Sequence, residues 1–262
     1  MKTTFKVIWI SILSTIVTML THILGNSNYH PLFTVKTPIV DIPYLFLINV
    51  CLLYVFLTLT FIGIKQYLPT SKLTKGVFYT NLIAVLFVFL NLEPTQIKSF
   101  SDFLIVILIV LVPFNVYGMF LGYLSSERTN KMKFDISMLG IFVVMISWLI
   151  FRGLYYVIDV DEPKMSNTFI TVLWLLLSGL VVGVVFFLIN NLIEESFFKK
   201  LMWISLLTVG TFVGYYLICY SVDMIFYPKQ YLKILFDIIS ILIGTSISNL
   251  IFGYKKKIEI LI

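Results

Sequence analysis

Residues 141–158 read IFVVMISWLIFRGLYYVI, an apolar run of helical length that carries a single charged side chain, Arg152. An apolar run of this length is long enough to be a transmembrane helix. A charge in the hydrocarbon core costs roughly 2.5–3.5 kcal/mol on insertion scales. Because such a residue must reach the surface, meet a partner or line a wet cavity, the rest of the sequence must supply one of these solutions.

The composition of the whole chain is that of an integral membrane protein. Hydrophobic residues make up 60% of the 262 positions and charged residues only 12%, whereas soluble domains have about 25% charged residues. No long polar block interrupts the chain, so we expect one transmembrane domain over residues 1–262. The net charge of +6 comes from lysines between the apolar runs, so we do not expect a nucleic-acid partner. The excess of Lys, Ile and Asn is typical of an AT-rich, bacterial genome.

Eight apolar runs of helical length follow one another along the chain. Each has about 17–24 residues, the length that a helix needs to cross a hydrocarbon core of about 30 Å. Backbone groups cannot stay unpaired in lipid, so runs of this length form helices. The sequence therefore predicts an all-α fold, a polytopic integral membrane bundle of eight transmembrane helices. The predicted spans are 7–24, 43–64, 76–92, 103–124, 136–158, 168–190, 201–222 and 232–254.

Basic residues between the runs alternate between the two sides of the predicted membrane. Lys and Arg gather in cytoplasmic connections, so the lysine-rich side is predicted to face the cytoplasm. Both termini then lie in the cytoplasm, and the protein is predicted to reside in the cell membrane. The rich side holds Lys2, Lys6, Lys65, Lys72, Lys75, Arg128, Lys131, Lys133, Lys199, Lys200, Lys255, Lys256 and Lys257, and the poor side holds Lys36, Lys98, Lys164 and Lys229.

Asp237 is the predicted partner of Arg152. Arg152 lies six residues before Ile158, and Asp237 lies six residues after Tyr231 on a helix that runs the opposite way. At 1.5 Å per residue, both side chains start roughly 9 Å below the outer boundary. Opposite charges at equal depth stabilise each other in lipid, so we expect an ion pair between the fifth and eighth helices. The alternative is that Arg152 extends to the surface while Asp237 pairs with Lys233.

Four predicted helices carry small residues at a four-residue spacing. Small side chains on one helix face let two backbones approach closely, which is how helices pack in lipid. We expect this packing inside the monomer; a seam between copies or a moving interface is the alternative. The residues are Gly118 and Gly122, Gly179 and Gly183, Gly210 and Gly214, and Gly244 between Ser240 and Ser248.

Pro113 and Asn115 mark a candidate helix break in the fourth predicted helix. Proline cannot donate a main-chain hydrogen bond, so we expect it to kink the helix. The alternative is a broken helix of the kind that forms binding sites in transporters. Tyrosines at the outer ends, including Tyr155, Tyr156 and Tyr216, fit an aromatic belt. A polar-aromatic pocket shared by the fifth and seventh helices is the alternative for these tyrosines.

Motifs for catalysis or metal binding are absent from the sequence. The two histidines, His22 and His30, have no zinc-ligand spacing, and no nucleophile elbow occurs. Cys51 and Cys219 lie in apolar runs without metal-ligand spacing. We therefore expect no enzyme activity, no cofactor and no metal.

The function expected from these features is a non-catalytic multi-pass membrane protein that acts through helix contacts. Its partner besides the lipid bilayer would be a membrane protein or a second copy of the chain. An accessory subunit of a secretion system and an immunity protein against a membrane-active toxin both fit this description. The alternative is a small-solute or ion transporter or channel with a site near Arg152 and Asp237. An enzyme acting on lipid is a third candidate.

Overall fold

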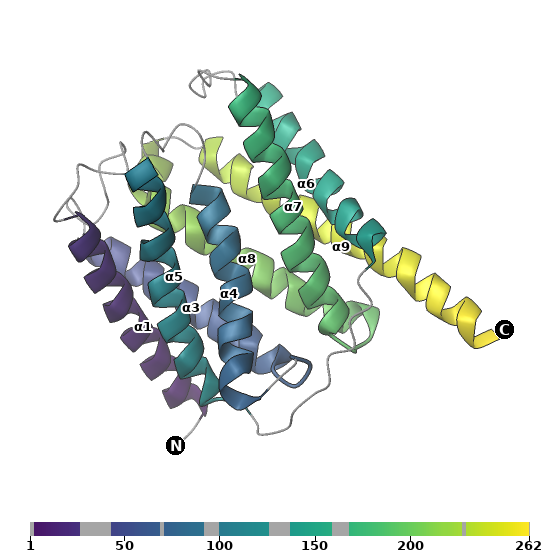
Figure 1. Ribbon diagram of the computed structural model, residues 1–262, viewed down its shortest axis with the longest axis horizontal. Helices are drawn as coiled ribbons and strands as arrows, with labels where there is room; N and C mark the ends of the chain where they lie inside the picture. Colours follow the sequence, from purple (N-terminus) through teal and green to yellow (C-terminus); the bar gives the residue numbers. More distant parts are fainter. Residues whose placement is uncertain are drawn as a thin grey trace.

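The computed structural model describes residues 3–26, 43–68, 71–91, 100–125, 137–158, 168–226 and 229–261. Eight helices in these segments are long and apolar enough to span a membrane, which agrees with the number expected from the sequence. Neighbouring helices along the chain run in opposite directions (Figure 1). The helices are α1 (Thr3–Asn26), α3 (Pro43–Ile64), α4 (Lys72–Asn91), α5 (Phe100–Gly122), α6 (Met138–Ile158), α7 (Thr168–Leu192), α8 (Phe197–Phe226) and α9 (Lys229–Leu261).

The helices form where apolar sequence is continuous, and local polar residues set several of their ends. Pro43 opens α3, where its missing N–H costs no helical hydrogen bond. Ser71 precedes α4, and its carbonyl oxygen accepts the hydrogen bond of the Lys75 amide at 3.0 Å. Three helices, α1, α8 and α9, extend at both ends beyond the apolar runs from which they were predicted.

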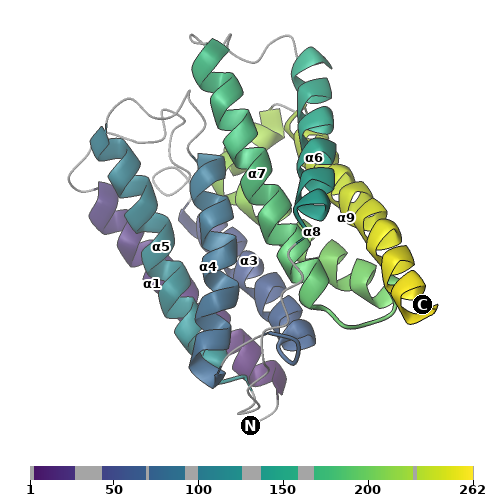
Figure 2. The same ribbon diagram turned by 45° about the vertical axis from the view of Figure 1, so that its right-hand side comes forward.

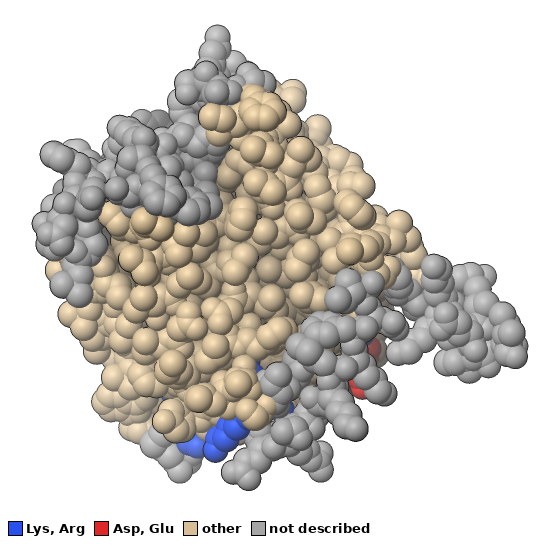
Figure 3. Space-filling view, viewed as in Figure 1, with Lys and Arg blue, Asp and Glu red and all other residues tan. Residues whose placement is uncertain are grey.

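Lysines mark one end of the bundle, which we call the basic end. They lie near the start of α1, just after α3, and in the first turns of α4 and α8. In the view of Figure 3, Lys and Arg side chains gather along the lower edge of the described surface. The basic residues described there are Lys6, Lys65, Lys72, Lys75, Lys199 and Lys200.

The helices divide into two halves with the same packing pattern, the first made of α1, α3, α4 and α5 and the second of α6 to α9. In each half, the first helix contacts the second and the fourth, and the third contacts the fourth. Between the halves, the second helix of each contacts the third helix of the other, as α3 with α8 and α4 with α7. Figures 1 and 2 show the halves side by side from two directions. The molecule is thus an approximate helix-packing repeat.

Two hydrogen bonds across the joint between the halves follow the same repeat. The Asn49 side chain on α3 donates to the main-chain oxygen of Leu217 on α8 at 3.0 Å. The Trp174 indole on α7 donates to the main-chain oxygen of Phe89 on α4 at 2.9 Å. Each donor lies six residues after the first residue of its helix. Buried apolar side chains from both halves belong to one continuous core.

Candidate functional site

The structure brings Arg152 of α6 and Asp237 of α9 together. An Arg152 Nη atom lies 2.9 Å from a carboxylate oxygen of Asp237, and the two side chains are only 2% and 1% exposed. The alternative in which Arg152 extends to the surface does not occur. Removing two charges from water is costly unless their geometry is good and their remaining groups are bonded. The groups around the pair therefore determine how much of its desolvation cost is offset.

Tyr216 of α8 completes a hydrogen-bonded triangle with the pair. Its hydroxyl accepts a hydrogen bond from Arg152 at 2.8 Å and donates one to the same Asp237 oxygen at 3.1 Å. The triangle thus joins three helices of the second half. Hydrogen bonds to charged groups are stronger than neutral ones, so this hydroxyl offsets part of the desolvation cost of the ions.

Aromatic rings surround the triangle, and a second buried cation, Lys233, lies among them. The Arg152 guanidinium lies 5.6 Å from the ring centres of both Trp148 and Tyr156. The Lys233 ammonium lies 5.5 Å from the Tyr155 ring and 5.9 Å from the Tyr216 ring, and its side chain is 2% exposed. Electron-rich ring faces attract cations, most strongly where water is excluded. These residues are the charged cluster: Trp148, Arg152, Tyr155, Tyr156, Tyr216, Lys233 and Asp237.

Small residues beside the charged cluster bring α6 and α9 close enough to form it. A side chain at Gly244 would collide with the backbone of Val144, so only glycine fits at this crossing. The Ser147 hydroxyl donates to the main-chain oxygen of Ser240 at 2.7 Å. The Ser240 hydroxyl in turn donates to the main-chain oxygen of Asp237 at 2.8 Å. This contact fixes the part of α9 that carries the carboxylate.

The charged cluster is closed to solvent and links three helices. Both charged groups of the pair are removed from solvent, and their shared hydrogen bonds are internal. Among the described residues, no group of three or more His, Cys, Asp or Glu side chains could hold a metal ion. The arrangement joins α6, α8 and α9 through buried hydrogen bonds.

The seven glycines predicted to pack helices all lie against another helix of the same chain. Gly118 and Gly122 of α5 meet the first turns of α4, where a side chain at Gly76 would collide with the Gly118 carbonyl. Gly179 and Gly183 of α7 lie against α6, and Gly244 of α9 also contacts α6. Gly210 and Gly214 of α8 lie against Phe56 and Leu53 of α3.

The candidate helix break at Pro113 is not seen, and α5 continues through this residue to Gly122. Asn115 donates to the Leu111 carbonyl at 2.8 Å, which is a bond within the same helix. It also accepts a 3.4 Å hydrogen bond from Asn81 of α4. Asn115 therefore strengthens the α4–α5 contact and opens no site in the backbone.

Two pairs of hydrogen-bonded hydroxyl groups in the first half were not predicted from the sequence. Tyr54 of α3 donates to Thr18 of α1 at 2.6 Å, because the Thr18 proton goes to its own helix. Tyr117 of α5 donates to Thr58 of α3 at 2.8 Å, because the Thr58 proton goes to the Tyr54 carbonyl. Threonine and tyrosine are common in apolar runs. Their position in the middle of predicted helices was therefore the only sequence feature that could have indicated these hydrogen bonds.

Comparisons with known proteins give no family to which the chain can be assigned. No protein-family model matches it, and searches of curated proteins and of solved structures found no significant match.

Proposed function

We propose that the chain is a multi-pass membrane protein, with its basic end in the cytoplasm, that works through helix contacts with a membrane partner. Eight apolar helices of spanning length support the membrane setting. The concentration of lysine at one end of the bundle supports the orientation. An accessory subunit of a secretion system and an immunity protein against a membrane-active toxin are the two roles that this proposal covers.

The observation that carries the proposal is the closure of the Arg152–Asp237 pair. A transport site must admit water or a solute to its charged groups during the cycle. Here the guanidinium lies between aromatic rings, and both charged side chains are almost fully buried. A transporter centred on these residues is therefore less well supported than a rigid scaffold.

The outward faces of the helices offer the contact surface that this function needs. Exposed apolar side chains run along α1, where Trp9 and Ile16 are examples, and along α7, where Leu173 and Leu177 are examples. Lipid satisfies such faces, and another transmembrane helix satisfies them equally well. The partner in this proposal is accordingly an apolar helix.

Vesicle reconstitution tests the choice between scaffold and transporter. We expect ion and small-solute flux no greater than in protein-free vesicles, for the natural sequence and for Asp237→Asn alike. Solute flux that is abolished by Asp237→Asn in a folded protein would overturn the proposal in favour of transport.

Membrane orientation is tested with single cysteines introduced after Cys51 and Cys219 have been replaced. We expect a membrane-impermeant thiol reagent to label Tyr231→Cys in intact cells and Ser71→Cys only in opened cells. The reverse pattern would refute the orientation.

Photocrosslinking tests the contact surface. A photoreactive residue at Ile16 or Leu173 should give a discrete protein adduct on one of the two faces, whereas the matched buried position Leu57 should give none. Adducts with lipid alone on both faces would contradict a contact function.

A further inference from the structure

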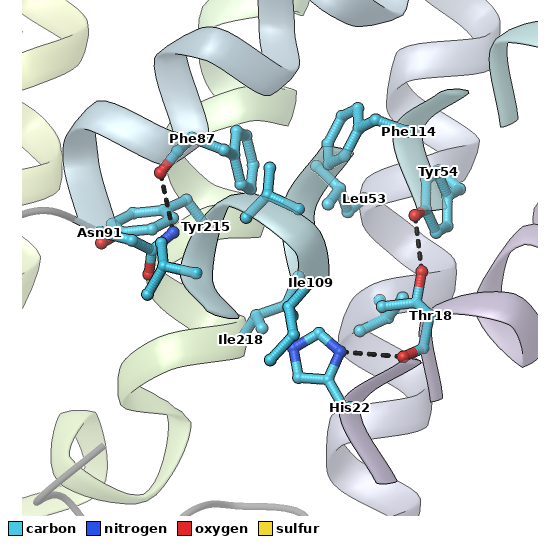
Figure 4. A pocket seen from close by; sticks show the side chains of 13 residues that line it. Thr18, His22, Leu53, Tyr54, Phe87, Asn91, Ile109, Phe114, Tyr215 and Ile218 are labelled. Carbon is cyan, nitrogen blue, oxygen red and sulfur yellow. Dashed lines mark hydrogen bonds between the residues drawn. The ribbon is translucent and has the colours of Figure 1, made fainter. Parts of the chain in front are cut away.

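A cavity of about 60 Å³ lies inside the first half of the molecule (Figure 4). Its wall is built by α1, α3, α4 and α5, with α8 of the second half closing one side. The lining includes Thr18 and His22 near the end of α1, Phe87 and Asn91 at the end of α4, and Ile109 in α5. These positions place the cavity toward the end of the bundle opposite the basic end.

The wall of the cavity is largely apolar, and the hydroxyl groups of Thr18 and Tyr54 and the amide of Asn91 already make hydrogen bonds within the protein. The Tyr54 hydroxyl is bonded to Thr18, and the Thr18 hydroxyl donates to the Ser14 carbonyl at 2.9 Å. The Asn91 side chain donates to the Phe87 carbonyl at 2.8 Å. A water molecule needs two to four polar partners, and apolar cavities stay dry and bind apolar molecules. The wall therefore suits an alkyl group.

His22 adds an imidazole ring to this wall, and one of its ring nitrogens can accept a hydrogen bond. Its Nδ1 lies 2.8 Å from the Thr18 carbonyl oxygen, and a carbonyl only accepts, so Nδ1 must carry a proton. In the neutral ring Nε2 is then an acceptor. Figure 4 shows the second ring nitrogen on the side away from Thr18, toward Ile109 and Ile218. The edge-to-face contact with Phe46, at 5.3 Å between ring centres, holds the ring in this orientation.

The cavity is lined by helices whose counterparts in the helix-packing repeat enclose the charged cluster. The first, third and fourth helices of the second half, α6, α8 and α9, enclose Arg152, Tyr216 and Asp237. Their counterparts in the first half are α1, α4 and α5, and these helices line the cavity. Where the second half places its charged cluster, the first half leaves an apolar hollow beside one histidine.

We propose that this cavity is a binding site for a short-chain aliphatic alcohol. The alkyl chain lies among Leu53, Ile109 and Phe114, and the hydroxyl donates a hydrogen bond to His22 Nε2. The volume limits the buried part of the ligand to a small alkyl segment, because an engineered apolar cavity that binds benzene is larger, at about 150 Å³. The site does not depend on the partner contact proposed above, since its lining faces inward.

Photolabelling of the full-length protein in lipid nanodiscs tests this site, with a hexanol that carries a diazirine as the probe. We expect adducts on lining residues of α1 and α5, mapped by mass spectrometry, and competition by 1-hexanol. Ile109→Trp fills the cavity and should lower labelling at least tenfold. The adjacent variant Leu108→Trp is the matched control and should leave labelling unchanged, because Leu108 is 59% exposed whereas Ile109 is 8% exposed.

His22→Phe tests the hydrogen bond separately, since it keeps a ring of similar size. One hydrogen bond changes affinity about fivefold, so 1-hexanol should compete about fivefold less well, while hexane competes equally with both proteins. Val106→Phe serves as a second filling variant if Ile109→Trp lowers the melting temperature. Labelling that spreads over lipid-facing residues and ignores both filling variants would overturn the proposal, as would unchanged competition by hexanol in His22→Phe.

Discussion

The two halves of the molecule pack their helices alike but fill the same place in opposite ways. Between α6, α8 and α9, the second half buries two cations and a carboxylate among aromatic rings. Between α1, α4 and α5, the first half has an apolar cavity next to His22. The polar groups nearest to it are two pairs of neutral hydroxyls, Tyr54 with Thr18 and Tyr117 with Thr58.

The difference shows how charge constrains packing. Neutral hydroxyls satisfy one another or a backbone carbonyl, so a cavity beside them has little electrostatic cost. A buried ion has a much larger desolvation cost and needs its partner, its hydrogen bonds and its rings all in place. The second half should therefore respond to single substitutions more strongly than the first.

A large loss of stability is expected from substitutions at the glycine contacts, which both halves share. In Gly76→Leu and Gly183→Leu the new side chain would collide with a backbone carbonyl, of Gly118 and of Ile141 respectively. Since backbone cannot move as a flexible side chain does, we expect a loss of about 3 kcal/mol or more in each. Melting temperature in detergent measures the loss. Gly153→Leu is the control, because nothing lies within 4 Å of the added carbon.

A smaller effect should separate the two halves. Tyr216→Phe removes a hydroxyl that bonds both charged groups, and we expect a loss of about 1.5 kcal/mol, near the upper end for buried membrane hydrogen bonds. Tyr54→Phe removes a hydroxyl bonded to Thr18, with an expected loss of about 0.6 kcal/mol. Equal losses in chemical denaturation would mean that the charged cluster has no special sensitivity.

Two matched variants test whether the hydrogen bonds across the joint between the halves are equivalent. Asn49→Leu and Trp174→Phe each remove one hydrogen bond to a main-chain oxygen of the other half. Each should cost about 0.6 kcal/mol, and the effects should add in the double variant because the bonds share no partner. A large effect of only one variant would show that the two bonds are not equivalent.

The smallest effect concerns pH at the basic end, where Tyr67 donates to Glu195 at 2.6 Å. That hydrogen bond, with the further one from Lys199, holds the pKa of Glu195 below its ordinary value of 4.5. The folded pKa is depressed, so this stabilisation is present above the unfolded value and is lost as pH falls through the folded value. The melting-temperature advantage over Glu195→Gln should thus be present at pH 7 and shrink in acid. An advantage that is constant with pH would contradict this assignment.

Much of the fold could be predicted from the sequence, because few backbone conformations suit long apolar runs. Apolar runs of spanning length form helices, and two opposite charges at equal depth, Arg152 and Asp237, have strong reason to meet. The third member, Tyr216, was predicted only as part of an aromatic belt or, as the alternative, of a polar-aromatic pocket, since tyrosines near helix ends usually serve the interface. Pro113 left both a kink and a break open in the sequence, and α5 continues through it because a helix can lose one hydrogen bond and continue. The cavity depends on side-chain packing from five helices, which no local pattern encodes.

The most direct test of the central claim is a double-mutant cycle on Arg152 and Asp237, measured as unfolding free energy in detergent. We expect Arg152→Ala and Asp237→Ala each to cost about 3–5 kcal/mol, because each leaves a buried charge without its partner. The double variant should recover much of this loss, which is a strong coupling between the two sites. Small and additive losses would contradict the account, because they would mean that the two charges are solvated separately and that α6 and α9 are not locked together.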